Sequence, residues 1–95
     1  MPEAEAELLA ERDRYNGERP GLGDELVDEI EQLTAQIVMS PKAFAVVPRS
    51  PAHRRAFERR FKLSVVYEIE GDEIHVVAIA PQRPRPEYWS NRSRS

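Results

Sequence analysis

The feature that most constrains the fold of this chain is a change in its hydrophobic period part-way along the sequence. In the first part, apolar residues recur at intervals of 4, 4, 3 and 4, at Leu22, Leu26, Ile30, Leu33 and Ile37. That spacing places one apolar stripe along a helix. Over residues 63–70 and 73–80 apolar residues instead recur at every second position, which is the period of a strand. The change predicts an α+β domain in which a helical layer packs on a sheet.

The N-terminal part is expected to form an antiparallel hairpin of two helices over residues 2–38. Residues 2–16 are rich in alanine, glutamate and leucine, which favour helix. A turn rich in glycine and proline follows at residues 17–23, and the second helix is predicted to run to about Val38. Because the connection is short, the two helices should lie side by side.

The C-terminal part is expected to form a three-stranded antiparallel meander over residues 54–80. The predicted strands cover residues 54–61, 63–70 and 73–80, and residues 40–53, which hold three prolines, are predicted to be a connecting loop. Phe57 and Phe61 should point toward the helices. The tail, residues 81–95, also holds three prolines and cannot be a central strand.

The Gly71-Asp72 pair between the last two predicted strands is typical of a two-residue hairpin turn. Such a turn fixes the register. It pairs Glu70 with Glu73, Ile69 with Ile74, Glu68 with His75, Tyr67 with Val76 and Val65 with Ala78.

Length and composition exclude several classes of protein. A chain of 95 residues forms one domain, residues 1–95. It has no cysteine, hence no disulfide or thiolate nucleophile, and its two histidines are far apart, so neither a metal site nor a cofactor is expected. It has no apolar run long enough to span a membrane and no visible secretory signal, and a cytoplasmic location is expected.

The net charge of −3 hides an asymmetry between the two parts of the chain. Residues 1–40 hold 11 acidic and 3 basic side chains, whereas residues 41–95 hold 6 acidic and 11 basic ones. The helical hairpin should therefore repel polyanions, and the C-terminal part could attract them.

Several short motifs occur in a characteristic order. They are Pro20-Gly21-Leu22-Gly23, Ser40-Pro41, Arg54-Arg55-x-x-x-Arg59-Arg60-Phe61, Val65-Val66-Tyr67-x-Ile69, Asp72-Glu73-Ile74-x-Val76-x-Ala78 and Arg83-x-Arg85-Pro86-x-Tyr88-Trp89. In this order and spacing they resemble the RelE/ParE toxins of type II toxin–antitoxin modules, in particular the plasmid-stabilisation subgroup. The resemblance covers about residues 2–92. Family members usually carry a strand before the first helix, and this chain begins near the point where that strand would end, so its sheet is expected to lack it.

The resemblance implies a toxin that is neutralised by a cognate antitoxin. Its target would be ribosome-bound mRNA, which the toxin cuts, or DNA gyrase, which it inhibits without being an enzyme. The alternative is a truncated, inactive toxin remnant that acts only as an antitoxin-binding module. The sequence leaves the choice between nuclease and gyrase inhibitor open.

The basic side chains are the candidate target-binding residues. Arginine binds phosphate through planar, bidentate contacts. The candidates are Arg54, Arg55, Arg59, Arg60, Lys62, Arg83 and Arg85. The first arginines are expected on one strand and the last two just after the final strand, about 10 Å away across the central strand, so the two groups could converge. Basic side chains on exposed strands also serve simply to keep a sheet soluble.

Cleavage of RNA needs a proton-transfer group as well as cations that stabilise the phosphorane. The catalytic candidates are Arg60, Arg83, Arg85 and Tyr88. Neither histidine suits the role. His53 is expected to be solvated in a loop bracketed by prolines, and His75 is expected to form a cross-strand ion pair with Glu68.

The sheet face opposite the helices is predicted to be apolar at Val66, Val77 and Ile79. A fully exposed face would be polar. Either the C-terminal segment around Trp89 folds across these residues or another chain covers them. The resemblance implies that such a chain would be an antitoxin segment, so that the candidate antitoxin-binding residues are Val66, Val77, Ile79 and Trp89.

Overall fold

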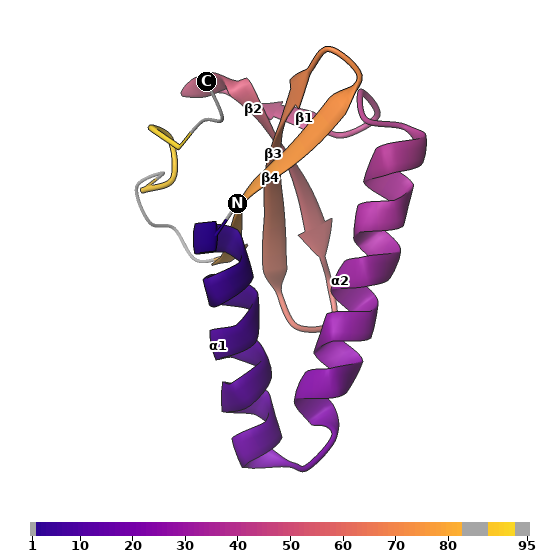
Figure 1. Ribbon diagram of the computed structural model, residues 1–95, viewed down its shortest axis with the longest axis vertical. Coiled ribbons are helices and arrows are strands. Elements are labelled where there is room, and N and C mark those ends of the chain that lie inside the picture. The colour runs from indigo at the N-terminus through magenta and orange to yellow at the C-terminus, as the bar shows by residue number, and fades with distance from the viewer. Residues whose placement is uncertain (1, 83–87, 93–95) are drawn as a thin grey trace.

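Two helices, α1 (Pro2–Glu18) and α2 (Leu22–Met39), form the predicted antiparallel hairpin (Figure 1). The computed structural model describes residues 2–82 and 88–92 of the chain. Gly21, between the helices, has a φ of 89°, which lies in the region that favours glycine. Within the described part of the chain, neither helix is both long enough and apolar enough to cross a membrane.

Gly23 lets the two helices approach each other closely. Its N–H donates a hydrogen bond of 2.7 Å to the side-chain oxygen of Asn16 on α1, which satisfies one free donor of the first turn of α2. A Cβ atom at Gly23 would lie only 2.0 Å from the carbonyl oxygen of Arg12. The second glycine of the Pro-Gly-Leu-Gly motif is therefore required by packing.

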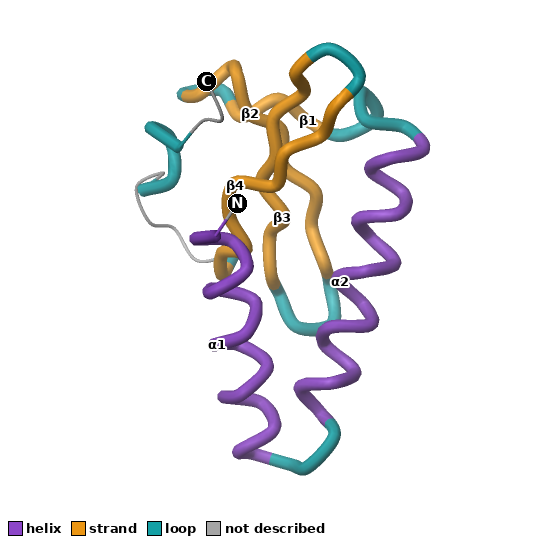
Figure 2. Tube along the Cα trace, in the orientation of Figure 1, coloured by secondary structure: helices purple, strands orange, loops and turns teal. Residues whose placement is uncertain are grey.

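A four-stranded antiparallel sheet follows the hairpin, with its strands side by side in chain order (Figure 2). The strands are β1 (Ala45–Val47), β2 (Ser50–Glu58), β3 (Leu63–Glu70) and β4 (Glu73–Pro81). The expected α+β class is confirmed, but the prediction of three strands is wrong. The segment predicted to be a loop contains β1, because the β-branched pair Val46-Val47 folds back on β2.

The register of β3 with β4 is confirmed near the turn and wrong farther along. The four pairs from Glu70 with Glu73 to Tyr67 with Val76 are as predicted, but Val65 lies opposite Ile79 and not Ala78. The register shifts between Val66 and Tyr67, which leaves one extra residue in β4. This irregularity is a β-bulge, a feature that simple counting from the turn cannot include.

The main core lies between the helices and one face of the sheet. Its buried members are Ala4, Leu26, Ile30, Leu33, Ile37, Ala56, Phe61, Leu63, Val65, Tyr67 and Ile79. Phe61 is buried as predicted, and its ring meets that of Tyr15 edge-on at 5.1 Å. The prediction for Phe57 is wrong. In β2 it is the neighbouring Ala56 that belongs to this core, and Phe57 is 51% exposed.

A second, smaller core covers the other face of the sheet. It consists of Val47, Val66, Val77, Ala78, Ala80 and Trp89. Trp89 is only 3% exposed. Of the two coverings considered for this face, the C-terminal segment of the same chain is the one observed.

Candidate functional site

The turn between β2 and β3, residues 59–62, presents three cationic side chains on a fixed backbone. The buried carboxylate of Glu58 accepts hydrogen bonds from the N–H groups of Arg60, at 2.8 Å, and Phe61, at 2.7 Å. Lys62 has a φ of 57°, which reverses the chain into β3. As a result Phe61 points into the core, while Arg59, Arg60 and Lys62 are exposed.

Gln82 ties the end of β4 to this turn. Its side-chain amide donates hydrogen bonds of 2.9 Å to the carbonyl oxygens of Glu58 and Leu63, and its N–H donates to that of Lys62 at 3.0 Å. Arg83 and Arg85 follow Gln82 in the sequence, and both lie outside the described residues. The convergence of Arg83 and Arg85 with the arginines of the turn therefore remains a prediction.

A cleft of about 550 Å³ lies beside the turn. It is lined by Glu11, Arg14, Tyr15, Phe61, Lys62, Leu63, Pro81 and Gln82, from α1, the turn and the end of β4. A volume of roughly 300–1,000 Å³ is typical of sites that take small molecules, so the cleft has room for one nucleotide unit.

Arg14 supplies the cleft with a cation that stays charged. Its guanidinium donates a hydrogen bond of 2.9 Å to Glu11 and lies 4.4 Å from the centre of the Tyr15 ring. The hydrogen bond to Glu11, followed by one to Tyr15, raises the pKa of Arg14. The cleft therefore contains a guanidinium that is paired with the carboxylates of Glu11 and Glu18, and beside it the side chain of Tyr15.

Arg60 connects the turn to α2. Its Nη2 atom donates a hydrogen bond of 2.5 Å to the Oε1 atom of Glu25. This hydrogen bond lowers the pKa of the Glu25 carboxyl and raises the pKa of Arg60. Both side chains are about half exposed, and an ion pair of this kind contributes little to stability. Arg60 can accordingly exchange Glu25 for an anionic group of a target at small cost.

None of the four arginines of this motif lines the cleft, and the two that precede the turn, Arg54 and Arg55, have contacts elsewhere. Arg54 donates hydrogen bonds to the carbonyl oxygens of Phe44, at 2.7 Å, and Lys42, at 3.3 Å, and so holds the segment before β1. Arg55 lies over the ring of Phe57, at 5.1 Å. The prediction that all four arginines lie on one strand is wrong, because β2 ends at Glu58 and Arg59 and Arg60 follow it.

His53 is buried, so the prediction that it is solvated is wrong. It is 2% exposed within β2, its Nδ1 lies 2.7 Å from the hydroxyl of Ser50, and its ring meets that of Trp89 edge-on at 5.2 Å. Its Nε2 lies 3.0 Å from the backbone carbonyl oxygen of Arg92. Since a carbonyl oxygen only accepts, Nε2 carries the proton. His53 thus holds the C-terminal segment against the sheet.

Glu7 on α1 holds the same segment from the other side. Its carboxylate accepts hydrogen bonds from the Tyr88 hydroxyl at 2.8 Å, from Arg92 at 3.0 Å and from the N–H of Ile79 at 3.1 Å. Arg92 also donates to the carbonyl oxygen of Val77 at 3.0 Å. Tyr88, a catalytic candidate, is therefore engaged in a structural contact.

The candidate antitoxin-binding residues are inside the protein. Val66, Val77 and Trp89 belong to the second core, and each is at most 3% exposed. Ile79 is on the other face, in the main core, because the bulge in β4 reverses its direction. A partner chain could contact Val66 and Val77 only by displacing the C-terminal segment.

His75 lies opposite Glu68 in the sheet, as predicted. The ion-pair contacts observed for its Nε2 atom are with Glu73 and Glu70, which the sequence did not suggest, and the predicted ion pair with Glu68 stays a prediction. This group is at the end of the sheet remote from the 59–62 turn (Figure 1).

Sequence reasoning missed several residues of the site. The side chains of Glu58 and Gln82 form hydrogen bonds with backbone groups in and beside the turn. Glu7 accepts hydrogen bonds from residues more than 70 positions away in the sequence. The spacing of Glu11 and Arg14, three apart on one helix, is the one signal that was readable in advance.

Comparison of the chain with protein-family models, with curated proteins and with solved structures finds no match in any of the three.

Proposed function

We propose that this chain is the toxin of a type II toxin–antitoxin module of the RelE/ParE kind, neutralised by a cognate antitoxin. The order of elements supports this proposal, because a helical hairpin precedes an antiparallel meander. The motif glycines support it as well, since Gly21 and Gly23 form the junction between the two helices.

The single observation that carries the proposed action is the basic turn beside the cleft. Arg59, Arg60 and Lys62 extend from a backbone that Glu58 and Gln82 hold in place. A fixed array of cations binds an anionic chain without a large ordering cost. Arg14 adds a further charge inside the cleft. These groups fit a phosphodiester backbone, and we therefore place mRNA on the ribosome first among the targets.

The content of the cleft also fits strand cleavage. The Tyr15 hydroxyl is a group that can transfer a proton, and Arg14 and Lys62 could stabilise the dianionic phosphorane. In this proposal Arg59 and Arg60 hold the neighbouring phosphates.

Inhibition of DNA gyrase without catalysis is the second candidate. The observation that favours it is the position of the histidines: His53 is buried against Trp89, and His75 lies in the β3–β4 hairpin near the end of β3 remote from the 59–62 turn. Neither can serve the cleft as an acid or a base. The internal contacts of Arg54 and Tyr88 are equally compatible with an inactive module that only binds the antitoxin.

The double variant Arg59→Ala/Lys62→Ala tests the basic turn. Both side chains are exposed, so the free energy of unfolding of the variant should lie within about 0.5 kcal/mol of that of the original chain. We expect it to relieve the growth inhibition that the chain causes when it is induced in bacteria without antitoxin. Colony counts after induction provide the measurement.

Arg49→Ala is the matched control, because Arg49 is an exposed arginine in the turn between β1 and β2, outside the cleft. It should remain as toxic as the original chain. If the double variant is as toxic as the original chain, the surface that binds the target lies outside the basic turn. A chain that is harmless but still binds an antitoxin would favour the inactive module.

A further inference from the structure

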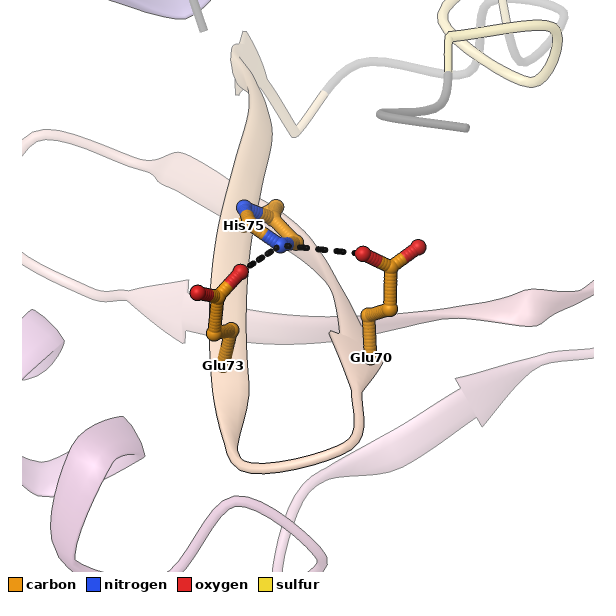
Figure 3. Close-up of side chains that lie close together, drawn as sticks. All are labelled: Glu70, Glu73 and His75. Carbon is orange, nitrogen blue, oxygen red and sulfur yellow. Dashed lines mark ion pairs between the residues drawn. The ribbon is translucent and has the colours of Figure 1, made fainter.

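We propose that the β3–β4 hairpin carries a binding site for a divalent transition-metal cation such as Zn²⁺, formed by Glu70, Glu73 and His75. Figure 3 shows the three side chains converging from the two strands next to the turn. The proposal does not depend on the proposed function, because this hairpin and the basic turn are at opposite ends of the sheet.

The register of the hairpin brings the three residues together. Glu70 and Glu73 face each other as the last pair before the Gly71-Asp72 turn. Gly71 has a φ of 60°, which this tight turn requires. His75 is two residues beyond Glu73, so both side chains leave β4 on the same face. The intervening residue, Ile74, packs on the main core, so the group lies on the face away from the helices.

Two of the three distances between the ligand atoms are close to those of a metal centre. The Nε2 atom of His75 lies 3.1 Å from a carboxylate oxygen of Glu73 and 3.8 Å from one of Glu70. All three ligand atoms lie within 4.8 Å of one another. Bonds of about 2.1 Å in a tetrahedron place two ligand atoms about 3.4 Å apart. The two observed distances bracket this value, and rotation of the exposed carboxylates would bring their oxygen atoms closer to each other around an ion.

The imidazole nitrogen is available as a ligand. Within the described part of the chain no hydrogen bond is directed at Nε2, which has almost no contact with solvent and meets the two carboxylates only as ion pairs. The side chain of His75 is 14% exposed, whereas those of Glu70 and Glu73 are 49% and 64% exposed. A cation can therefore enter from the carboxylate side and reach a nitrogen that otherwise lacks a hydrogen bond.

The ligand set indicates the kind of ion. Imidazole nitrogen with two carboxylates suits Zn²⁺ and its neighbours in the first transition row. Mg²⁺ and Ca²⁺ prefer sites made of oxygen alone. Two carboxylates balance the charge of a divalent ion, and water would complete its coordination. Bound metal would link β3 to β4 and so stabilise the folded chain.

Titration of the purified, metal-free chain with ZnCl₂ in a calorimeter tests the proposal. We expect saturable uptake of one equivalent and a rise in the melting temperature. Removal of a residue that only hydrogen-bonds to a metal ligand lowers metal affinity by about 10–100-fold. Removal of a ligand itself, as in His75→Gln, should therefore weaken zinc binding at least tenfold. The double variant Glu70→Gln/Glu73→Gln, which changes exposed residues, should do the same with the fold intact.

Asp72→Asn is the control, because it removes a neighbouring exposed carboxylate that is not part of the group. It should bind zinc as the original chain does. The chain has two histidines, so the imidazole signals in a proton NMR spectrum identify the site: those of His75 should shift and those of His53 should not. Absence of saturable uptake, undiminished affinity in the Glu70/Glu73 double variant, or a shift of His53 alone would overturn the proposal.

Discussion

Replacement of Gly23 by alanine is expected to destabilise the protein by about 3 kcal/mol, the upper end of the usual cost of overpacking. The new Cβ would lie 2.0 Å from the backbone oxygen of Arg12, which cannot move aside as a flexible side chain could. The helices would have to separate, and the hydrogen bond from Gly23 to Asn16 would be lost with them. Denaturant unfolding followed by circular dichroism measures the loss.

Gly17→Ala is the matched control for this prediction. Gly17 also lies in a helix, but among the described residues no atom beyond its chain neighbours and the adjacent helix backbone comes within 4 Å of a Cβ atom placed there. Alanine at that position should stabilise the protein by about 0.5–1 kcal/mol, because glycine is the poorer helix former. The two substitutions should therefore have opposite signs. A gain from Gly23→Ala would show that the helices are not in close contact at this point.

Replacement of Trp89 by alanine is expected to lower the free energy of unfolding by about 3–5 kcal/mol. Trp89 is the large aromatic side chain of the second core, and its loss would also remove the ring that covers His53. The substitution should release the C-terminal segment and expose Val66 and Val77. Thermal and denaturant unfolding give the magnitude, and binding of a hydrophobic dye reports the exposed face.

Tyr88→Phe is a milder change in the same segment. It removes the hydrogen bond to Glu7 while it keeps the ring, and a loss of about 0.5–1.5 kcal/mol is expected. Trp89 is the only tryptophan of the chain, so its fluorescence in this variant should stay that of a buried indole. A cost below 1 kcal/mol for Trp89→Ala would mean that the segment does not cover the sheet in solution.

The elements defined by local signals could be predicted from the sequence. The stripe from Leu26 to Ile37 is the buried face of α2. The Gly71-Asp72 turn fixes the first four pairs of the hairpin, as its two-residue length requires. In both cases the residues that determine the structure are neighbours in the sequence.

Features that depend on distant residues could not be predicted. The bulge in β4 moves Ile79 from one face of the sheet to the other, and no turn or glycine marks it in the sequence. His53 is buried by Trp89 and by the carbonyl oxygen of Arg92, which is 39 residues away. From the sequence alone, a histidine between two prolines is as compatible with an exposed loop as with a buried strand.

The candidate site was predicted only in part. The motif Arg-Arg-x-x-x-Arg-Arg-Phe indicated a cationic surface, but β2 ends inside it. As a consequence Arg54 and Arg55 have structural contacts, and Arg59 and Arg60 lie in the exposed turn. The contribution of Arg14 depends on how α1 packs beside that turn, which the sequence does not specify.

The most direct test of the central claim is to add the purified chain to a cell-free translation reaction and to measure both protein synthesis and the length of the mRNA. Our account predicts that synthesis stops and that the mRNA is cut only when ribosomes are present, with both effects weakened in Arg59→Ala/Lys62→Ala. A parallel supercoiling assay with DNA gyrase identifies the second candidate target. Undiminished synthesis with intact mRNA, at a concentration of the chain equal to that of the ribosomes, would contradict the claim.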